Sequence, residues 1–250
     1  MTVTNIKPSP EETTQRVVLS NISWQTYESL LAEAGDKRSS RFSYSQGVLE
    51  ILMPSDLHET INCLLKRIVT ALTEELDLKI KGFGSTTLNR EDLEQGAEPD
   101  SCFYIQNVDR ILGRRLDIST DPPPDLVIEV DITSPSSNRF VVYTQPEIPE
   151  VWRYRGQTVQ IYQLQNREYI TCDHSPTFPI LSVAMLNQFL QMAETQDDNA
   201  IIRSLRQWAS EQLRSPDNEQ YSSSRCYEVQ SIIMKYHCVI KPNESIFTRF

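Results

Sequence analysis

The sequence predicts an α/β (α+β) fold, in which helices flank a mixed sheet, on three observations. Apolar residues recur at three- and four-residue steps from Asp56 to Leu76, which predicts an amphipathic helix of about five turns. Residues 126–130 are apolar on both alternating faces, as expected of a central strand covered on both sides. Shorter strand patterns surround these two elements, and strands mixed with covering helices indicate a layered architecture.

A short helix and a hairpin are predicted before the long helix. Residues 23–34 carry apolar side chains at helical spacing, and Ser23 is suited to cap the first turn. Residues 41–45 alternate in polarity, Gln46-Gly47 is a turn signal, and residues 48–53 form an apolar run. These two runs therefore predict a β-hairpin.

Further elements follow the long helix. Strand candidates lie at residues 78–83, 86–89 and 100–105, a polar connection spans 106–121, and a second hairpin is expected from 150–155 and 158–164. Two helices are expected at residues 183–192 and 199–213. The predicted organisation is a flexible leader at 1–20, one domain at 21–214 and a poorly ordered tail at 215–250.

Composition limits the class of protein. The chain has 250 residues, 39% of them hydrophobic and 23% charged, and no run approaches the roughly 18 apolar residues of a membrane span. The polar start from Met1 to Glu12 matches neither a secretory signal nor a transit peptide, so a soluble, cytoplasmic protein is expected. Five cysteines without Cys-x-x-Cys spacing predict buried, reduced thiols rather than disulfides or zinc sites.

The net charge of −10 argues against a general nucleic-acid binder, because affinity for the phosphate backbone comes mainly from Lys and Arg. A metal-dependent nuclease needs an acidic centre, however, so the local charge matters more than the total. Arginines on both sides of Glu129 could form a basic rim or could simply be solvated surface.

Asp100 and Glu129 are the candidate metal ligands. Asp100 lies at the beginning of one predicted strand, and Glu129 lies near the end of another. Mg²⁺ prefers oxygen ligands and typically takes one or two carboxylates, with water and substrate phosphate completing its octahedron. A bound ion of this kind neutralises charge on a scissile phosphate and activates water. Arg139 is the best candidate for a fixed positive charge beside the ion.

Several short motifs together resemble the Uma2 family of restriction endonucleases, which belongs to the PD-(D/E)XK nuclease superfamily. The motifs are residues 46–51, His58-Glu59, Gly84-Ser85-Thr86-Thr87, Glu98-Pro99-Asp100, residues 124–130, Ser134-Pro135-Ser136 and residues 149–154. The resemblance runs from about Trp24 to Trp208. It implies a restriction-endonuclease-like core that cleaves DNA with Mg²⁺ or Mn²⁺, and two cuts in a duplex make a homodimer plausible.

The resemblance assigns Asp100 to the Pro-Asp element and Glu129 to the Glu-x-Lys element. The third position of the second element is Asp131 rather than Lys, which departs from the superfamily's pattern. Many relatives carry the basic residue on the following helix, four residues before a tyrosine, and Arg139 stands four residues before Tyr143. Arginine stays charged, so it can stabilise a phosphate in the transition state but is poorly suited to act as a general base.

Other residues near this centre have two interpretations each. Asp131 is either a third ligand or an exposed acid at a strand end, and His58 either approaches the metal or the phosphate or is structural. Glu59 is favoured as a helix-capping acid, since negative charge stabilises a helix N-terminus. Asp125 is expected to cap a turn, and Trp152 and Tyr154 are expected to pack rather than to stack on bases.

Three functions follow from these residues. The first is a Mg²⁺-dependent DNA endonuclease that uses Asp100, Glu129 and Arg139. The second is a catalytically degenerate nuclease fold that binds DNA or protein, because its catalytic Lys is replaced. The third is a structural or interaction protein without a metal, in which Glu129→Gln would stabilise the fold.

Overall fold

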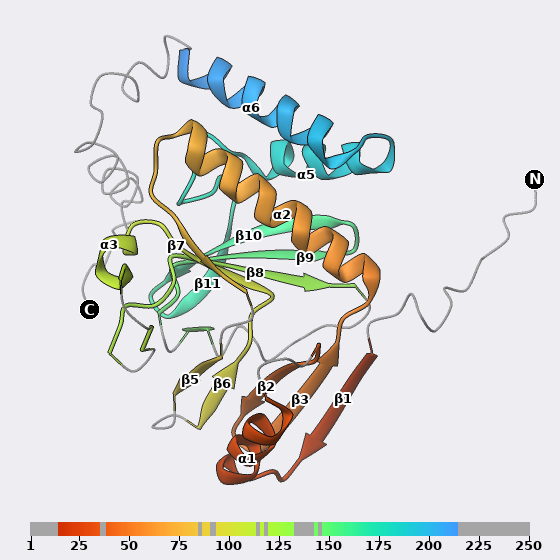
Figure 1. The fold of residues 1–250 in the computed structure, drawn as a ribbon, viewed down its shortest axis with the longest axis vertical. Helices are drawn as coiled ribbons and strands as arrows, with labels where there is room; N and C mark the ends of the chain where they lie inside the picture. Colours follow the sequence, from red (N-terminus) through yellow and green to blue (C-terminus); the bar gives the residue numbers. More distant parts are fainter. Residues whose placement is uncertain are drawn as a thin grey trace, which may run out of the picture. The chain divides into compact units, whose positions relative to one another are not determined.

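A computed structural model describes residues 15–35, 39–84, 87–90, 94–113, 116–117, 120–132, 143–144 and 147–214. Their contacts divide the chain into two units, residues 1–206 and 207–250. The first unit contains two β-sheets with helices against them (Figure 1), so the predicted α+β class is confirmed. Within the described part of the chain, no helix is long and apolar enough to cross a membrane.

The N-terminal sheet has the strand order β1-β3-β2-β6-β5. Its strands are β1 (Gln15–Ser20), β2 (Arg41–Ser45), β3 (Val48–Met53), β5 (Leu88–Arg90) and β6 (Gln95–Ala97). The predicted hairpin is β2 and β3. Helix α1 (Trp24–Ala34) begins at the predicted cap, where the Ser23 hydroxyl accepts from the amide of Thr26 at 3.2 Å. Its Tyr27 ring stacks on Tyr44 of β2 with centroids 5.0 Å apart.

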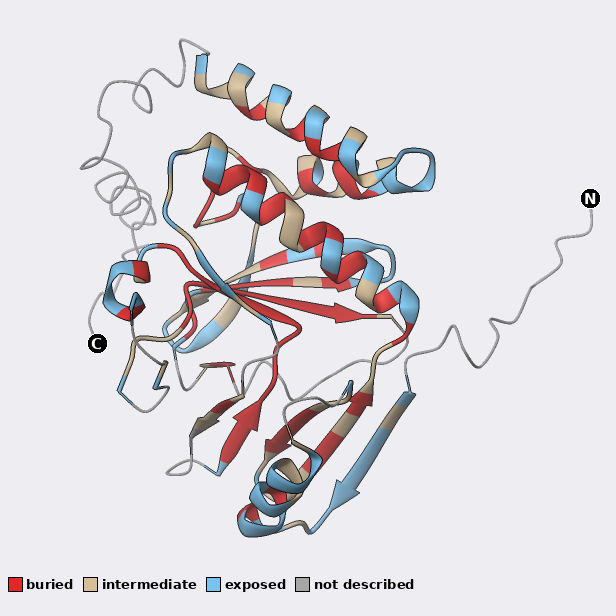
Figure 2. Ribbon diagram, viewed as in Figure 1, coloured by how far each residue is buried: buried red, intermediate tan, exposed pale blue. Residues whose placement is uncertain are grey.

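The second sheet has the order β11-β10-β9-β8-β7-β4. Its strands are β4 (Lys81–Phe83), β7 (Ser101–Tyr104), β8 (Leu126–Asp131), β9 (Glu150–Arg155), β10 (Thr158–Gln165) and β11 (Glu168–Cys172). Strands β8 and β9 are parallel, which makes the sheet mixed. Every residue of β8 is buried, as Figure 2 shows, and this confirms the predicted central strand.

Helix α2 (Asp56–Glu75) lies across the face of the second sheet (Figure 1). Its apolar stripe, which includes Leu65, Ile68 and Leu72, is completely buried. The other helices are α3 (Val108–Ile111), α5 (Val183–Gln191), the 3₁₀ turn η2 (Met192–Glu194) and α6 (Asp198–Arg214). Asn187 fixes α5 to β10, because its side chain both accepts from the amide of Val159 and donates to its carbonyl.

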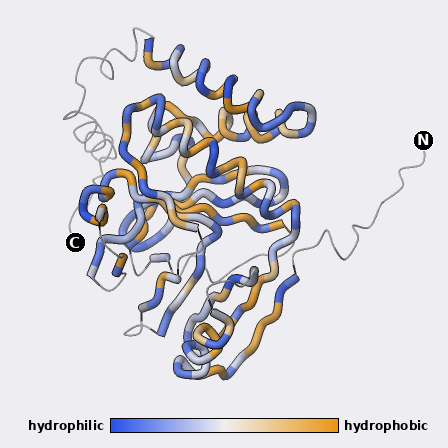
Figure 3. Tube along the Cα trace, in the orientation of Figure 1, coloured by the Kyte–Doolittle hydropathy of each residue, from blue (hydrophilic) through white to orange (hydrophobic). Residues whose placement is uncertain are grey.

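Some sequence-based boundaries need correction. Residues 15–20 of the predicted leader form β1, a strand drawn mostly as exposed in Figure 2, and its Val17, Val18 and Leu19 are exposed hydrophobic side chains. Figure 3 shows hydrophobic residues along the same strand. Strands β6 and β11 were not predicted, because β6 has only three residues and β11 is mostly exposed and weakly apolar.

The cysteines show a further difference. Cys102 is buried as predicted, but Cys63 is exposed on α2 and Cys172 is intermediate, and all three are free thiols. The helical period explains the error at Cys63, since this residue follows Asn62 on the outer side of an otherwise buried stripe. Cys226 and Cys238, like residues 1–14 and the tail from residue 215, lie outside the described residues.

Candidate functional site

Strand pairing brings Asp100 and Glu129 together. Strands β7 and β8 are antiparallel, and Ser101 is paired with Ile128. One step beyond this pair, Asp100 therefore comes opposite Glu129, and residues opposed across two strands have neighbouring side chains. The Oδ2 atom of Asp100 accepts from the amide of Val130 at 2.8 Å. Both acids are buried, with exposed fractions of 1% and 3%.

Asn62 and Ser101, which were not singled out from the sequence, hold Asp100 in place. The Asn62 side chain on α2 donates to the backbone carbonyl of Asp100 at 3.3 Å, and the Ser101 hydroxyl lies 2.8 Å from the Asn62 side-chain oxygen. Just before Asp100, the Glu98 carboxylate accepts from the amide of Phe42 at 2.8 Å and from the Thr87 hydroxyl at 2.7 Å. Glu98 thus fixes the approach to Asp100 against β2.

Glu129 is held by Tyr143. The Tyr143 hydroxyl donates to Oε1 of Glu129 across a very short contact, and both side chains are buried. In the sequence, Tyr143 was noted only because it stands four residues after Arg139. Its contact with Glu129 depends on the return of the chain beside β8, which the sequence does not reveal. Arg139 itself lies outside the described residues.

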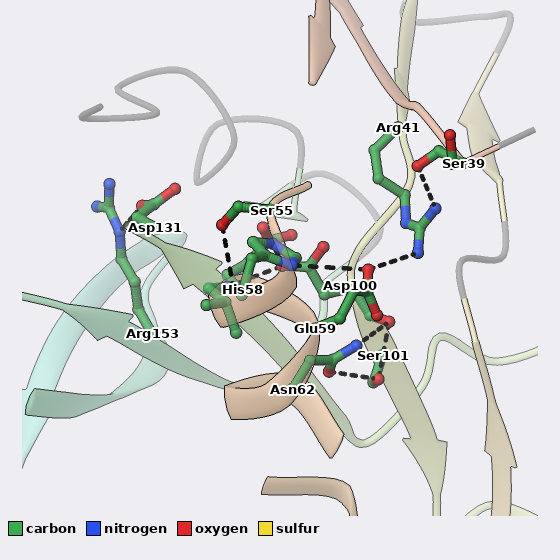
Figure 4. A network of polar contacts seen from close by, with 12 residues as sticks. Ser39, Arg41, Ser55, His58, Glu59, Asn62, Asp100, Ser101, Asp131 and Arg153 are labelled. Atoms are coloured by element: carbon green, nitrogen blue, oxygen red, sulfur yellow. Dashed lines mark hydrogen bonds and ion pairs between the residues drawn. The ribbon is translucent and has the colours of Figure 1, made fainter. Parts of the chain in front are cut away.

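His58 on the first turn of α2 lies against Asp100, as Figure 4 shows. Its Nε2 atom is 3.1 Å from Oδ2 of Asp100, and its Nδ1 atom is 3.7 Å from Oε1 of Glu59. Burial of the imidazole, the largest single influence, lowers the pKa of His58, but the hydrogen bond and the charge of Asp100 oppose it, and the pKa lies above its ordinary value. Glu59 and Glu129 add to this upward shift.

Glu59 has the position of a helix-capping acid. Its side chain is 45% exposed, and its carboxylate is 3.5 Å from the Arg41 guanidinium as well as near His58. A half-exposed acid in the first turn of a helix interacts favourably with the helix dipole. Glu59 therefore contributes charge at the edge of the site.

The interpretation of Asp131 as an exposed acid is wrong, and its interpretation as a third ligand stays a prediction. It is buried rather than exposed, and its Oδ2 atom accepts from Nε of Arg153 at 2.6 Å. The side chain of Arg153 on β9 is 11% exposed, so it is a partly buried partner rather than solvated surface. The position that would hold the superfamily's Lys is therefore an acid with its own cationic partner.

Two more buried acids serve the fold. Asp125 accepts from the amides of Ile105 and Asn107 at 2.7 and 3.1 Å, which agrees with its expected turn role. Glu150 on β9 is completely buried and accepts from the Trp152 indole at 2.5 Å and from Ser175 and Thr177. Burial raises the pKa of Glu150, and these donors oppose the shift. Trp152 thus packs inside, as expected.

The donor set suits a hard divalent cation. Asp100 and Glu129 supply two buried carboxylates, which is the number that Mg²⁺ commonly takes from a protein. Burying two such groups together costs several kcal/mol unless cations or hydrogen bonds compensate. Among the described residues, no three His, Cys, Asp or Glu side chains already form a complete metal-binding group. The residues present therefore fit an open site in which two carboxylates bind one ion, and they do not fit a closed structural metal site.

Comparison with known proteins agrees with this geometry. The model of the Uma2 family, described as "Putative restriction endonuclease", matches residues 24–194, which include both acids and the two sheets around them. No curated protein gives a significant match. Because the matched segment covers more than half of the chain, this protein belongs to the Uma2 family.

Proposed function

We propose that the protein is a DNA endonuclease that depends on Mg²⁺ or Mn²⁺ held by Asp100 and Glu129. One observation carries the proposal: two carboxylates from adjacent strands are buried opposite each other in the core of a restriction-endonuclease family member. Such a pair is unfavourable in a purely structural core, and it suits an ion that binds phosphate oxygen.

The bound ion would supply charge neutralisation at the scissile phosphate and a water of lowered pKa. In this chain, the Val130 amide and Asn62 keep Asp100 in position, and Tyr143 orients Glu129. Arg139 supplies positive charge to the phosphate, a role inferred from its sequence position. Burial of the acids excludes bulk water, which strengthens every electrostatic interaction at the site.

Nicking of supercoiled plasmid with Mg²⁺ or Mn²⁺ tests the proposal. We expect metal-dependent nicking by the wild type and loss of nicking in Asp100→Asn and Glu129→Gln purified in parallel. Glu168→Gln, at the exposed start of β11, is the matched control and should retain activity. Equal nicking by the wild type and Asp100→Asn would identify a contaminating nuclease and overturn the proposal.

A second function is favoured by the Asp131–Arg153 pair. This partly buried ion pair occupies the position of the superfamily's Lys, which is what a nuclease fold retained only for binding would tolerate. In that case, the wild type binds duplex DNA in a gel-shift assay but nicks it with no divalent ion, and Arg139→Lys gains activity. Nicking by the wild type that falls in Arg139→Lys would exclude this function.

A metal-free structural role makes the opposite prediction for stability. Without an ion, Glu129→Gln removes an unfavourable buried charge and raises the free energy of unfolding, and calorimetric titration with Mn²⁺ gives no heat. A binding isotherm for Mn²⁺ would exclude this role.

A further inference from the structure

Arg41 is a charged side chain that the fold largely encloses. It begins strand β2, and its backbone is paired with Leu52 in the β2–β3 hairpin. Its side chain is only 13% exposed, whereas surface arginines usually keep the charged end in water. Arginine stays charged at any relevant pH, so a guanidinium in this setting needs anions or other acceptors around it.

Within the described part of the chain, the Arg41 guanidinium has few acceptors. Its Nη1 atom donates to the backbone carbonyl of Ser39 at 3.2 Å. Its Nη2 atom lies 3.5 Å from Oε1 of Glu59, whose side chain is 45% exposed. Its Nε atom is buried and has no hydrogen-bond partner among the described residues. Because every nitrogen of a guanidinium is a donor, Arg41 can bind a further anion without losing its contact with Ser39.

The contact between Arg41 and Glu59 is long for an arginine of this protein. Other arginines have a carboxylate at 2.6 or 2.7 Å, namely Arg16 with Glu50, Arg153 with Asp131 and Arg206 with Glu75. Charge-assisted hydrogen bonds of this kind are typically about 2.7–2.9 Å long. An ion pair at 3.5 Å to a half-exposed acid contributes little, so a stronger anion can replace Glu59.

Strand pairing places Arg41 beside the proposed metal site. The next residue, Phe42, is held to Glu98: the Glu98 amide donates to the Phe42 carbonyl at 3.1 Å, and the Phe42 amide donates to the Glu98 carboxylate at 2.8 Å. Asp100 follows Glu98 by two residues. Figure 4 shows the Arg41 guanidinium directed toward Glu59, at the edge of the group of polar side chains around Asp100.

We propose that Arg41 binds a DNA backbone phosphate next to the scissile phosphate, and that Glu59 holds the guanidinium in place until DNA replaces it. The inference rests on the proposed metal site, because the ion fixes where the scissile phosphate lies. A phosphate group accepts paired, parallel hydrogen bonds from a planar guanidinium, which Glu59 does not do at 3.5 Å. A cation at this edge also offsets the repulsion between the acids of the site and the DNA backbone.

The salt dependence of DNA binding tests the phosphate contact. Fluorescence anisotropy measures the Kd for a labelled duplex with the full chain at several salt concentrations, with Ca²⁺ in place of Mg²⁺ to prevent cleavage. Each neutralised phosphate contributes about 0.9 to the slope of log Kd against log salt, so Arg41→Gln should lower this slope by about one. Arg203→Gln, a matched control at an exposed arginine of α6, should leave it unchanged. An unchanged slope in folded Arg41→Gln would overturn the inference.

Arg41→Lys separates the charge of Arg41 from its geometry, and it decides the question if Arg41→Gln does not fold. Lysine keeps the positive charge but lacks the planar pair of donors. The salt slope should therefore stay at the wild-type value, while the affinity for the duplex falls by about threefold or more. Equal affinity of Arg41→Lys and the wild type would overturn the paired contact with a phosphate.

A double-mutant cycle tests the role of Glu59. Glu59→Gln removes the acid that competes with DNA for the guanidinium, so duplex affinity should rise by about threefold in the wild type and by less in Arg41→Gln. Equal gains would show that Glu59 merely repels DNA and would overturn the competition.

The plasmid assay separates this inference from the proposed nuclease. Metal-dependent nicking that is lost in Asp100→Asn, together with an unchanged salt slope in Arg41→Gln, refutes only the phosphate contact. A lowered slope in a protein that nicks no DNA with any divalent ion refutes only the nuclease.

Discussion

Glu150 on strand β9 and Asp100 at the beginning of strand β7 are both buried carboxyl groups, but the groups around them differ in kind. The partners of Glu150 are an indole, a hydroxyl and a backbone amide, all of which are neutral donors. Asp100 accepts from a backbone amide and lies against the ionisable side chain of His58, on which the charges of Glu59 and Glu129 also act. One acid is enclosed by dipoles, and the other lies within a group of charges.

The difference separates an acid that stabilises the fold from an acid that suits a ligand. Neutral donors satisfy the oxygens of Glu150 without a counter-ion, and burial raises its pKa. Asp100 instead has ionisable neighbours, the imidazole of His58 and the carboxylates that act on it, and such a setting suits a bound cation. Burial by itself therefore does not identify a functional carboxylate, whereas the type of its partners does.

The largest expected effect is on activity in Asp100→Asn. The amide can still accept from Val130, but it supplies no charge to the ion, so metal-dependent nicking should fall by about 10³-fold. Plasmid nicking rates measure this change, and urea unfolding should show a smaller loss of stability than Glu150→Ala. If Asp100→Asn is instead the more unstable of the two variants, the contrast between the two acids is wrong.

The second largest effect is on stability in Glu150→Ala. This substitution leaves three buried donors without an acceptor and opens a cavity, so the free energy of unfolding should fall by about 3 kcal/mol or more. Urea denaturation measures the change, and Glu150→Gln, which keeps an acceptor oxygen and the size, should lose less. A loss below about 1 kcal/mol in Glu150→Ala would show that these donors find other partners.

Two tyrosines give a smaller and closely matched comparison. Tyr143 donates to the carboxylate of Glu129, whereas the Tyr169 hydroxyl lies 2.8 Å from the neutral carbonyl of Ile148. Hydrogen bonds to charged groups contribute about 1.5–3 kcal/mol and those to neutral groups about 0.5–1.5 kcal/mol. Tyr143→Phe should therefore destabilise the metal-free protein more than Tyr169→Phe, as measured by urea unfolding.

Saturating Mn²⁺ sharpens this tyrosine comparison. Ion binding replaces the donor that Glu129 has lost, so Mn²⁺ should reduce the difference between Tyr143→Phe and the wild type. It should leave the loss in Tyr169→Phe unchanged. Equal effects of Mn²⁺ on both variants would count against a metal role for Glu129.

The smallest effect concerns pH. The folded pKa of Glu150 is raised by burial, so the folded state holds its proton more tightly than the unfolded state. The contribution of this group to stability is complete below its unfolded pKa of about 4.5, and it is lost as pH rises toward the folded pKa. Urea unfolding between these values should show a decline in the wild type that is absent in Glu150→Gln. Parallel pH profiles would assign the decline to another group.

Local patterns in the sequence were enough to predict α1, the β2–β3 hairpin, α2 and β8. In each case the period of apolar residues is long or a cap and turn signal is strong, as with Ser23 and Gln46-Gly47. Strands β6 and β11 escaped prediction because pairing with neighbours, rather than an apolar period, makes them strands. Strand β1 is likewise defined by its pairing with β3, although its side chains are largely exposed.

The sequence by itself determined the family and the mixed fold and proposed the two candidate acids, because all of these depend on residue types and spacings along the chain. Only the tertiary structure decided the partners of those acids. It placed His58 beside Asp100, Tyr143 on Glu129 and Arg153 on Asp131, across separations in sequence that no local pattern records. The physical reason is that a carboxylate's role depends on which dipoles and charges surround it after folding, and the strand register together with the placement of α2 fixes them.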